Sequence, residues 1–208
     1  MTTNYLTSKR QFLTLLFMIF VLNCILTQNN FDTDDICEIS TDGNGNSKGI
    51  KLKLNIPCEW LEYDGKLPSV VKKFGFALDD KYDTKLTQIT IINLVVGVTS
   101  TMKPPADIFS IENLKRNIPP GSIFISGGIS KVDGLESGET ISKTVYPSAN
   151  NNLIGYTLNY MTFYSNKVIN ISYGVTSSDD KNSQLYFNKY QKYFRFLSSK
   201  TEILNKNK

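Results

Sequence analysis

The sequence of 208 residues contains no histidine. The chain therefore cannot build a Ser-His-Asp triad, a Cys-His nucleophile, a histidine-ligated metal site or a histidine pH switch. The net charge is also small, since 23 basic and 19 acidic residues leave only +4. Such a weak positive charge argues against a nucleic-acid partner. Aromatic residues are plentiful instead. Twelve Phe and eleven Tyr can bury a core, so a chain that is disordered throughout is excluded.

The N-terminus has the pattern of a secretory signal peptide. Lys9 and Arg10 form a positive region, and the first acidic residue is Asp32. From Phe12 to Leu26 nearly every residue is apolar, a run shorter than the ~20 residues that a membrane-spanning helix needs. We therefore predict that residues 1–27 are a signal peptide. The protein is then exported to the periplasm, the cell envelope or the extracellular space.

The sequence leaves the processing of this leader open. Val21-Leu22-Asn23-Cys24 resembles a bacterial lipobox, in which Cys24 would be acylated and become the mature N-terminus. Asn23 departs from the small residue that normally precedes such a cysteine, and the apolar run continues past Cys24. Cleavage near residues 27–30 and an uncleaved anchor are the alternatives. Contact with a membrane is expected only through an anchor in this segment.

Two cysteines lie beyond the leader, Cys37 and Cys58. An even number in an exported protein favours a disulfide, which by loop-closure entropy would stabilise the fold by about 3 kcal/mol. The alternative is two separate small core residues. Catalysis by Cys58 is not expected, because no histidine exists to activate it, and a two-cysteine zinc site would lack its other ligands. No metal or cofactor site is predicted, and the glycines at 127, 128, 134 and 138 fit no phosphate-binding motif.

Alternating apolar residues predict a set of β-strands in one domain, residues 49–198. The predicted strands are 49–56, 70–78, 86–98, 122–131, 139–146, 153–164 and 167–175. The third is apolar without alternation, so we expect it to be central and covered on both faces. The last two form a hairpin around Ser165-Asn166.

Two helices and two polar ends complete the prediction. Helical spacing of apolar residues indicates a helix over 106–117. Ser177 to Asp180 can cap a second helix, whose apolar stripe is Tyr186, Tyr190, Tyr193, Phe194 and Leu197. Residues 28–48 are expected to be a polar lead-in loop, and residues 199–208 a frayed polar tail.

Four short motifs occur along the chain: IPCEW at 56–60, PPADIF at 104–109, GGISKVDGLESGE at 127–139 and GYTLNYMTFYSNKVINISY at 155–173. Together with the order of strands and helices, they resemble the PsbP/DcrB-like family of secreted or lipid-anchored domains. The resemblance implies an α+β fold, an antiparallel sheet of about six to seven strands with helices packed on it. It also implies a binding, assembly or accessory role without a shared catalytic site.

Carboxylates and tyrosines are the remaining candidates for a functional site. The carboxylate pairs are Asp34/Asp35, Asp79/Asp80, Asp179/Asp180 and Glu136/Glu139. They would serve a hydrolase only if two carboxylates faced each other across a cleft, whereas in turns and caps they bind their own backbone. The hairpin tyrosines have two interpretations: packing beneath the last helix, or an exposed surface for a partner or glycan. These tyrosines are Tyr156, Tyr160, Tyr164 and Tyr173.

From these observations we expect a monomeric, non-enzymatic binding or accessory protein of the cell envelope. It would act through its surface on a protein or small-ligand partner. The alternatives are a carboxylate-dependent hydrolase and an envelope inhibitor or immunity protein. Two facing carboxylates would favour the hydrolase, and a flat exposed aromatic patch would favour partner binding.

Overall fold

The computed structural model describes residues 35–63, 69–78, 90–101, 104–147 and 152–205. The chain divides into two units, residues 1–34 and 35–208, and the description below concerns the second. The predicted signal peptide and Cys24, the predicted lipidation site, lie outside the described residues. So do Asp34, Asp79 and Asp80.

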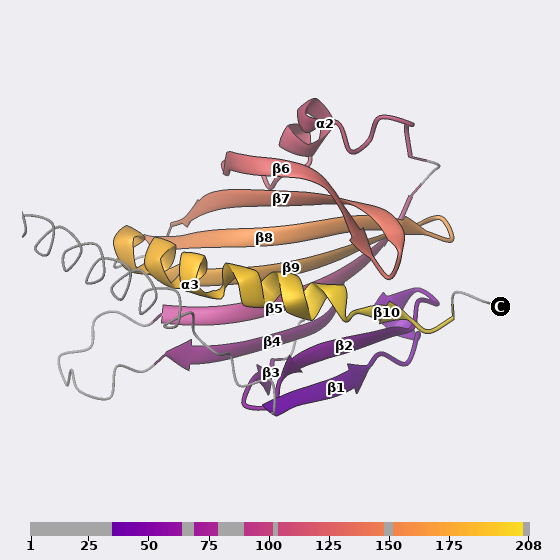
Figure 1. Cartoon of the computed structure of the whole chain (residues 1–208), viewed down its shortest axis with the longest axis horizontal. Helices are drawn as coiled ribbons and strands as arrows, with labels where there is room; N and C mark the ends of the chain where they lie inside the picture. Colours follow the sequence, from indigo (N-terminus) through magenta and orange to yellow (C-terminus); the bar gives the residue numbers. More distant parts are fainter. Residues whose placement is uncertain (1–34, 64–68, 79–89, 102–103, 148–151, 206–208) are drawn as a thin grey trace, which may run out of the picture. The chain divides into compact units, whose positions relative to one another are not determined.

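Seven strands form one antiparallel sheet. Their bounds are β3 (Leu61–Glu62), β4 (Val70–Leu78), β5 (Thr90–Ser100), β6 (Ile123–Val132), β7 (Leu135–Tyr146), β8 (Leu153–Tyr164) and β9 (Lys167–Ser177). Their order across the sheet is β3-β4-β5-β9-β8-β7-β6 (Figure 1). Strands β6 to β9 follow one another as a meander, and β9 returns the chain to the side of β5. The pattern of apolar residues therefore located six of these strands, and β8 and β9 form the predicted hairpin.

Three more strands form a second sheet in the order β1-β2-β10: β1 (Ile36–Ser40), β2 (Leu52–Pro57) and β10 (Glu202–Ile203). The prediction of a polar lead-in loop over 28–48 was wrong where β1 pairs along β2. The prediction of a frayed tail was also wrong, because β10 pairs with β2 and buries Thr201 and Ile203. Both strands are short, so pairing with β2 stabilises them more than their own composition does.

Two helices lie among the described residues. α2 (Ile111–Arg116) is shorter than the predicted 106–117, and Ser110 caps it by accepting a hydrogen bond from the Asn113 N–H. α3 (Asp180–Ser199) begins after Asp179, whose carboxylate accepts hydrogen bonds from the N–H groups of residues 181 and 182. The predicted stripe is displaced by one position at its start. Phe187 is buried and Tyr186 is only half-buried, because Phe187 is the residue that turns toward the sheet.

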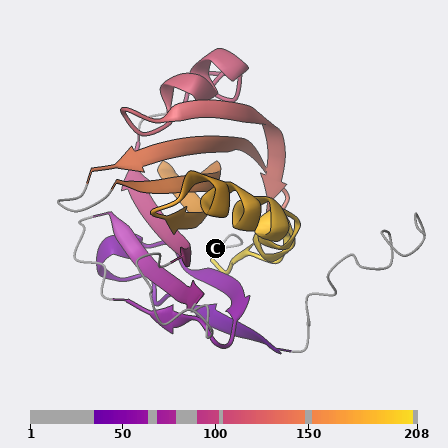
Figure 2. The ribbon, with the colours of Figure 1, turned by 90° about the vertical axis from the view of Figure 1, so that its left-hand side faces the viewer.

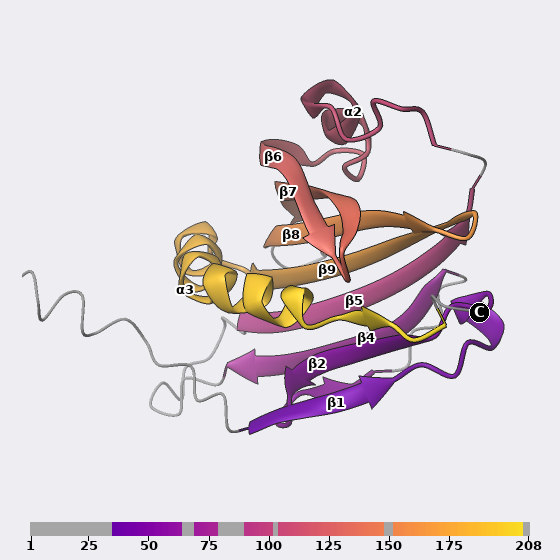
Figure 3. The same ribbon diagram turned by 45° about the vertical axis from the view of Figure 1, so that its right-hand side comes forward.

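Helix α3 packs against β8, β9 and β2, so it lies between the two sheets (Figures 2 and 3). At its centre the fully buried Phe194 stacks on Tyr173 with ring centroids 5.3 Å apart. The core continues through β5 and β9 on the same face. Its fully buried members there include Leu94, Val96, Ile169, Ile171 and Val175.

Strand β5 is central, but the expectation that both of its faces are covered was wrong. Ile92, Leu94 and Val96 are buried on one face of the sheet, whereas the alternate residues are half-buried or, at Ile91, exposed. α2 contacts β6 and β7, which β9 and β8 separate from β5, so it does not cover the second face of β5. On β7, Gly138 allows the close approach of α2, because a Cβ on it would lie 2.5 Å from Cδ2 of Leu114.

A disulfide joins Cys37 to Cys58, the pair expected from the sequence. It ties β1 to the turn that follows β2, where the Cys58 N–H also donates to the Asp35 carbonyl at 2.8 Å. Trp60 is buried beside this turn. The predicted α+β fold, an antiparallel sheet with helices packed on it, is confirmed.

Candidate functional site

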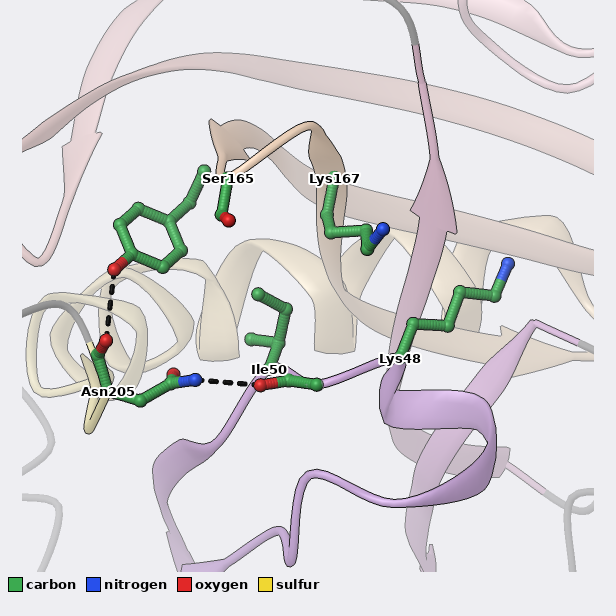
Figure 4. Close-up of a pocket in the computed structure, with 7 residues that line it drawn as sticks. Lys48, Ile50, Ser165, Lys167 and Asn205 are labelled. Atoms are coloured by element: carbon green, nitrogen blue, oxygen red, sulfur yellow. Dashed lines mark hydrogen bonds between the residues drawn. The ribbon is translucent and has the colours of Figure 1, made fainter. Parts of the chain in front are cut away.

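A surface pocket of about 330 Å³ lies where three distant parts of the chain meet (Figure 4). They are the segment before β2, the turn between β8 and β9, and the end of the chain after β10. The pocket is lined by Lys48, Gly49, Ile50, Tyr164, Ser165, Lys167 and Asn205. Ile50 is buried and apolar, whereas the other lining residues carry polar groups. The pocket therefore offers a ligand one apolar side chain and several hydrogen-bonding groups.

Two tight turns hold the sides of the pocket. Lys48 follows the short 3-10 helix η2 (Gly45–Ser47) with a left-handed φ of 48°, and Gly49 has a φ of 89°. Across the pocket, Ser165 and Asn166 have φ values of 49° and 57°, as a two-residue type I′ hairpin turn requires. Asn is favoured in this conformation and Ser less so. Both turns therefore fix the backbone from which the lysines of the pocket extend.

Hydrogen bonds from the chain's end close the third side. The Tyr164 hydroxyl donates to the Asn205 carbonyl at 3.0 Å, and the Asn205 side-chain amide donates to the Gly49 carbonyl at 2.7 Å (Figure 4). The Lys51 N–H donates to the Asn205 side-chain oxygen at 3.2 Å, and the Leu204 N–H donates to the Lys51 carbonyl at 2.8 Å. These bonds hold the end of the chain against the segment before β2, so the pocket depends on the docked tail.

The charge of the lining comes from lysines alone. Lys48 and Lys167 contribute ammonium groups, and no residue of the lining is acidic. Lys167 Nζ lies 3.4 Å from the Ser100 hydroxyl, a long hydrogen bond. Among the described residues neither lysine forms a salt bridge. The pocket can therefore donate hydrogen bonds and attract negative charge, but its lining contains no carboxylate for general acid-base catalysis.

The structure separates the four tyrosines that the sequence singled out. Tyr156, Tyr160 and Tyr173 are buried beneath α3, so the interpretation as an exposed interaction surface was wrong for these three. Burial raises the pKa of Tyr160 and of Tyr173 well above the ordinary value. Tyr164 lies on the same face near the end of β8. It is half-buried and reaches the pocket instead.

Sequence reasoning missed the other polar residues of the pocket: Lys48, Ser165, Lys167 and Asn205. Nothing distinguishes Lys48 or Lys167 in a chain with 23 basic residues. Asn205 lies in the segment predicted to fray, so its contact with Gly49 was not foreseen. The only local signal was the Ser165-Asn166 turn, which fixed where β8 ends and β9 begins.

Three described carboxylates of the predicted pairs, Asp179, Asp180 and Glu139, serve structural contacts. Asp179 caps α3, while Asp180 accepts hydrogen bonds from Lys143 Nζ at 2.6 Å and the Tyr156 hydroxyl at 2.9 Å. Glu139 binds Arg195 of α3 at 2.6 Å, whereas Glu136 points to the opposite face of β7, since residues three apart on a strand face opposite sides. Within the described ranges, no group of three or more Cys, Asp or Glu side chains could hold a metal ion.

The contact between Asp180 and Lys143 predicts how stability changes in acid. The hydrogen bond from Lys143, followed by that from Tyr156, lowers the pKa of Asp180. A carboxyl with a depressed pKa stabilises the fold above its unfolded value of about 3.9, and this contribution is lost as the pH falls through the folded pKa. Because Asp180 is 46% exposed, we expect Asp180→Asn to cost only about 0.5–1 kcal/mol at pH 7. The measurement is urea unfolding of both proteins from pH 2 to pH 7.

The control for this prediction is Lys143→Met. In that background the effect of Asp180→Asn at pH 7 should shrink, because the main partner of the carboxylate is gone. A difference between Asp180→Asn and the original protein that stays constant down to pH 2 would contradict the assignment.

The comparisons with known proteins that found a match are with solved structures. No protein-family model and no curated protein matches the chain. Among solved structures, LpqN of Mycobacterium tuberculosis, described as involved in cell envelope biogenesis, matches with a TM-score of 0.45 and 12% sequence identity. The match covers 81% of this chain and 91% of the LpqN chain. Likeness at this level transfers no role from LpqN, and the resemblance to the PsbP/DcrB-like family stays a prediction.

One feature of the described helices bears on membrane contact. Within the part of the chain that the structure describes, neither helix is both long and apolar enough to cross a membrane.

Proposed function

We propose that the protein is an exported, non-enzymatic binding protein of the cell envelope, and that the pocket around Tyr164 and Asn205 is its binding site. The observation that carries the proposal is the make-up of that pocket. Its polar side chains are lysine, serine, tyrosine and asparagine, held by turns and hydrogen bonds, without a carboxylate. Such a lining suits recognition of a ligand better than acid-base chemistry.

Export is supported by the leader and the disulfide. The pattern of residues 1–27 is that of a secretory signal, and disulfides persist in oxidising compartments. The bond between Cys37 and Cys58 joins two parts of the second unit, so it belongs to the folded domain. The resemblance to PsbP/DcrB-like domains supports a binding or accessory role in the same compartment. Tyr156, Tyr160 and Tyr173 are buried, so the exposed patch that they would have formed does not support partner binding.

The proposal is tested by fractionating the native cells and by measuring the mass of the intact protein with mass spectrometry. We expect to find it in the envelope or the medium. Its mass should lack the leader and should be lower than that of the reduced protein by two hydrogen atoms. An added acyl mass would identify Cys24 as the lipidated mature N-terminus. Finding the full-length chain in the cytosol would refute export.

The non-enzymatic part is tested separately with a broad hydrolase screen on the purified protein. We expect no turnover. Turnover that disappears on Asp or Glu substitution would establish the carboxylate-dependent alternative instead.

A further inference from the structure

We propose that the pocket between Lys48 and Lys167 binds the phosphate group of a small phosphomonoester. This inference rests on the proposed function, because it names the ligand class of the same pocket. Two ammonium groups line a space without acidic residues, and Figure 4 shows both lysine side chains extending to the same side of the pocket. A negative group placed there meets positive charge from two separate parts of the chain.

In the part of the domain that the structure describes, some lysines are paired with carboxylates, whereas the two lysines of this pocket are not. On the neighbouring sheet Lys53 binds Glu202 at 2.6 Å, and under α3 Lys143 binds Asp180 at the same distance. Lys48 and Lys167 have no carboxylate partner within the described residues. No described carboxylate neutralises their charge, and both side chains line the same pocket, where a ligand can meet them.

The neutral side chains give the pocket a fixed shape. Tyr164 and Asn205 are engaged with each other and with the Gly49 carbonyl, so their positions are set before any ligand arrives. The Ser165 hydroxyl lies at the exposed turn between them and Lys167, where it can donate a third hydrogen bond. A prearranged set of donors lowers the entropy cost of binding.

Phosphate fits this donor set better than carboxylate. A phosphomonoester carries about −1.5 to −2 charges at pH 7 and three strong acceptor oxygens, which matches two ammonium groups and one hydroxyl. Lysine binds phosphate as a point charge and does not need the planar fork by which arginine holds a carboxylate. A volume of about 330 Å³ also leaves room for a small organic group beyond the phosphate.

The experiment is a nuclear magnetic resonance titration of the purified exported protein with sodium phosphate. Sodium chloride at the same ionic strength is the reference, since exposed charges respond to any salt. We expect saturable shifts of the backbone amides of Gly49, Ser165 and Asn166, with a dissociation constant on the order of 1–10 mM. Binding should tighten from pH 5.5 to pH 7.5, because phosphate gains its second charge while lysine stays protonated.

Substitutions locate the binding at the two lysines. Lys48→Met and Lys167→Met should each weaken binding about 3- to 10-fold, and the double variant should lose saturation. The matched control is Lys181→Met with Lys192→Met, which removes the same charge from exposed positions on α3. The control should bind within about 2-fold of the original protein, and the urea midpoint checks that every variant is folded.

Two results would overturn the inference: shifts that chloride reproduces, or a pocket variant that binds as well as the control. Glycerol phosphate and vesicles containing phosphatidic acid then distinguish a soluble ligand from a lipid headgroup, and binding to either supports the site. The proposed function is refuted by different measurements, namely a cytosolic location or turnover in the hydrolase screen. A protein that binds no phosphate could still be exported and inactive in that screen, so failure of this inference is distinguishable from failure of the proposed function.

Discussion

Replacing Phe194 with alanine is expected to lower the free energy of unfolding by about 3–5 kcal/mol. The ring is fully buried in α3 and lies within 5.3 Å of Tyr173, 6.1 Å of Tyr190 and 6.3 Å of Phe187, measured between ring centroids. Alanine would lose the transfer energy of the ring and would leave a cavity between α3 and the large sheet. Urea unfolding followed by circular dichroism measures the loss, provided that the slope with denaturant is unchanged.

Leu185→Ala on the same helix is the matched control. Leu185 is 64% exposed, so its truncation to alanine should change stability by no more than about 0.5 kcal/mol. Phe194→Leu should fall between the two, because leucine keeps most of the buried volume. A loss below about 1 kcal/mol for Phe194→Ala would show that α3 does not pack on β9 as described.

The sequence predicted those elements whose pattern is local. Period-two alternation located β2, β8 and β9, the Ser165-Asn166 pair located the turn, and Asp179 was within the segment predicted to cap α3. Each of these signals depends on residues within one turn or strand. The backbone conformation that they favour can therefore be predicted before any tertiary contact is known.

The remaining features depend on partners distant in sequence. β1 and β10 exist through their pairing with β2, and the exposed side of β5 depends on where α2 and α3 pack. The alternation of β8 places Tyr156, Tyr160 and Tyr164 on one face, but only the length of α3 decides which of them are covered. Sequence therefore favoured packing beneath the last helix, which is confirmed for Tyr156, Tyr160 and Tyr173, but it did not show that Tyr164 reaches the pocket instead.

The pocket was the least predictable part for the same reason. Gly49 and Asn205 are 156 residues apart in the chain, yet a hydrogen bond between them closes one side of the site. Neither lysine was singled out from the sequence, because their charge becomes informative only once the fold brings them to one pocket whose lining has no acidic residue. A binding site assembled from turns and a chain end gives no periodic signal along the sequence.

Removing the disulfide with Cys37→Ser and Cys58→Ser is expected to lower the free energy of unfolding by about 3 kcal/mol. The two cysteines are 21 residues apart, so the bond chiefly restricts the unfolded chain by closing this loop. Without it, β1 still pairs with β2, but at the edge of the small sheet. The slope of unfolding with denaturant should rise, because an unfolded chain without a crosslink exposes more surface.

Reductant provides the control that separates the bond from the substitutions. Dithiothreitol should lower the unfolding midpoint of the original protein to near that of the double serine variant, and it should leave the variant unchanged. If the substitutions only weakened the packing of β1, stability would fall but the slope of the free energy of unfolding with denaturant would not rise. The slope therefore tells whether the bond acts by crosslinking the unfolded chain or by local packing. A midpoint that reductant does not move, in protein whose thiols are shown to be free, would mean that the bond contributes nothing to the fold.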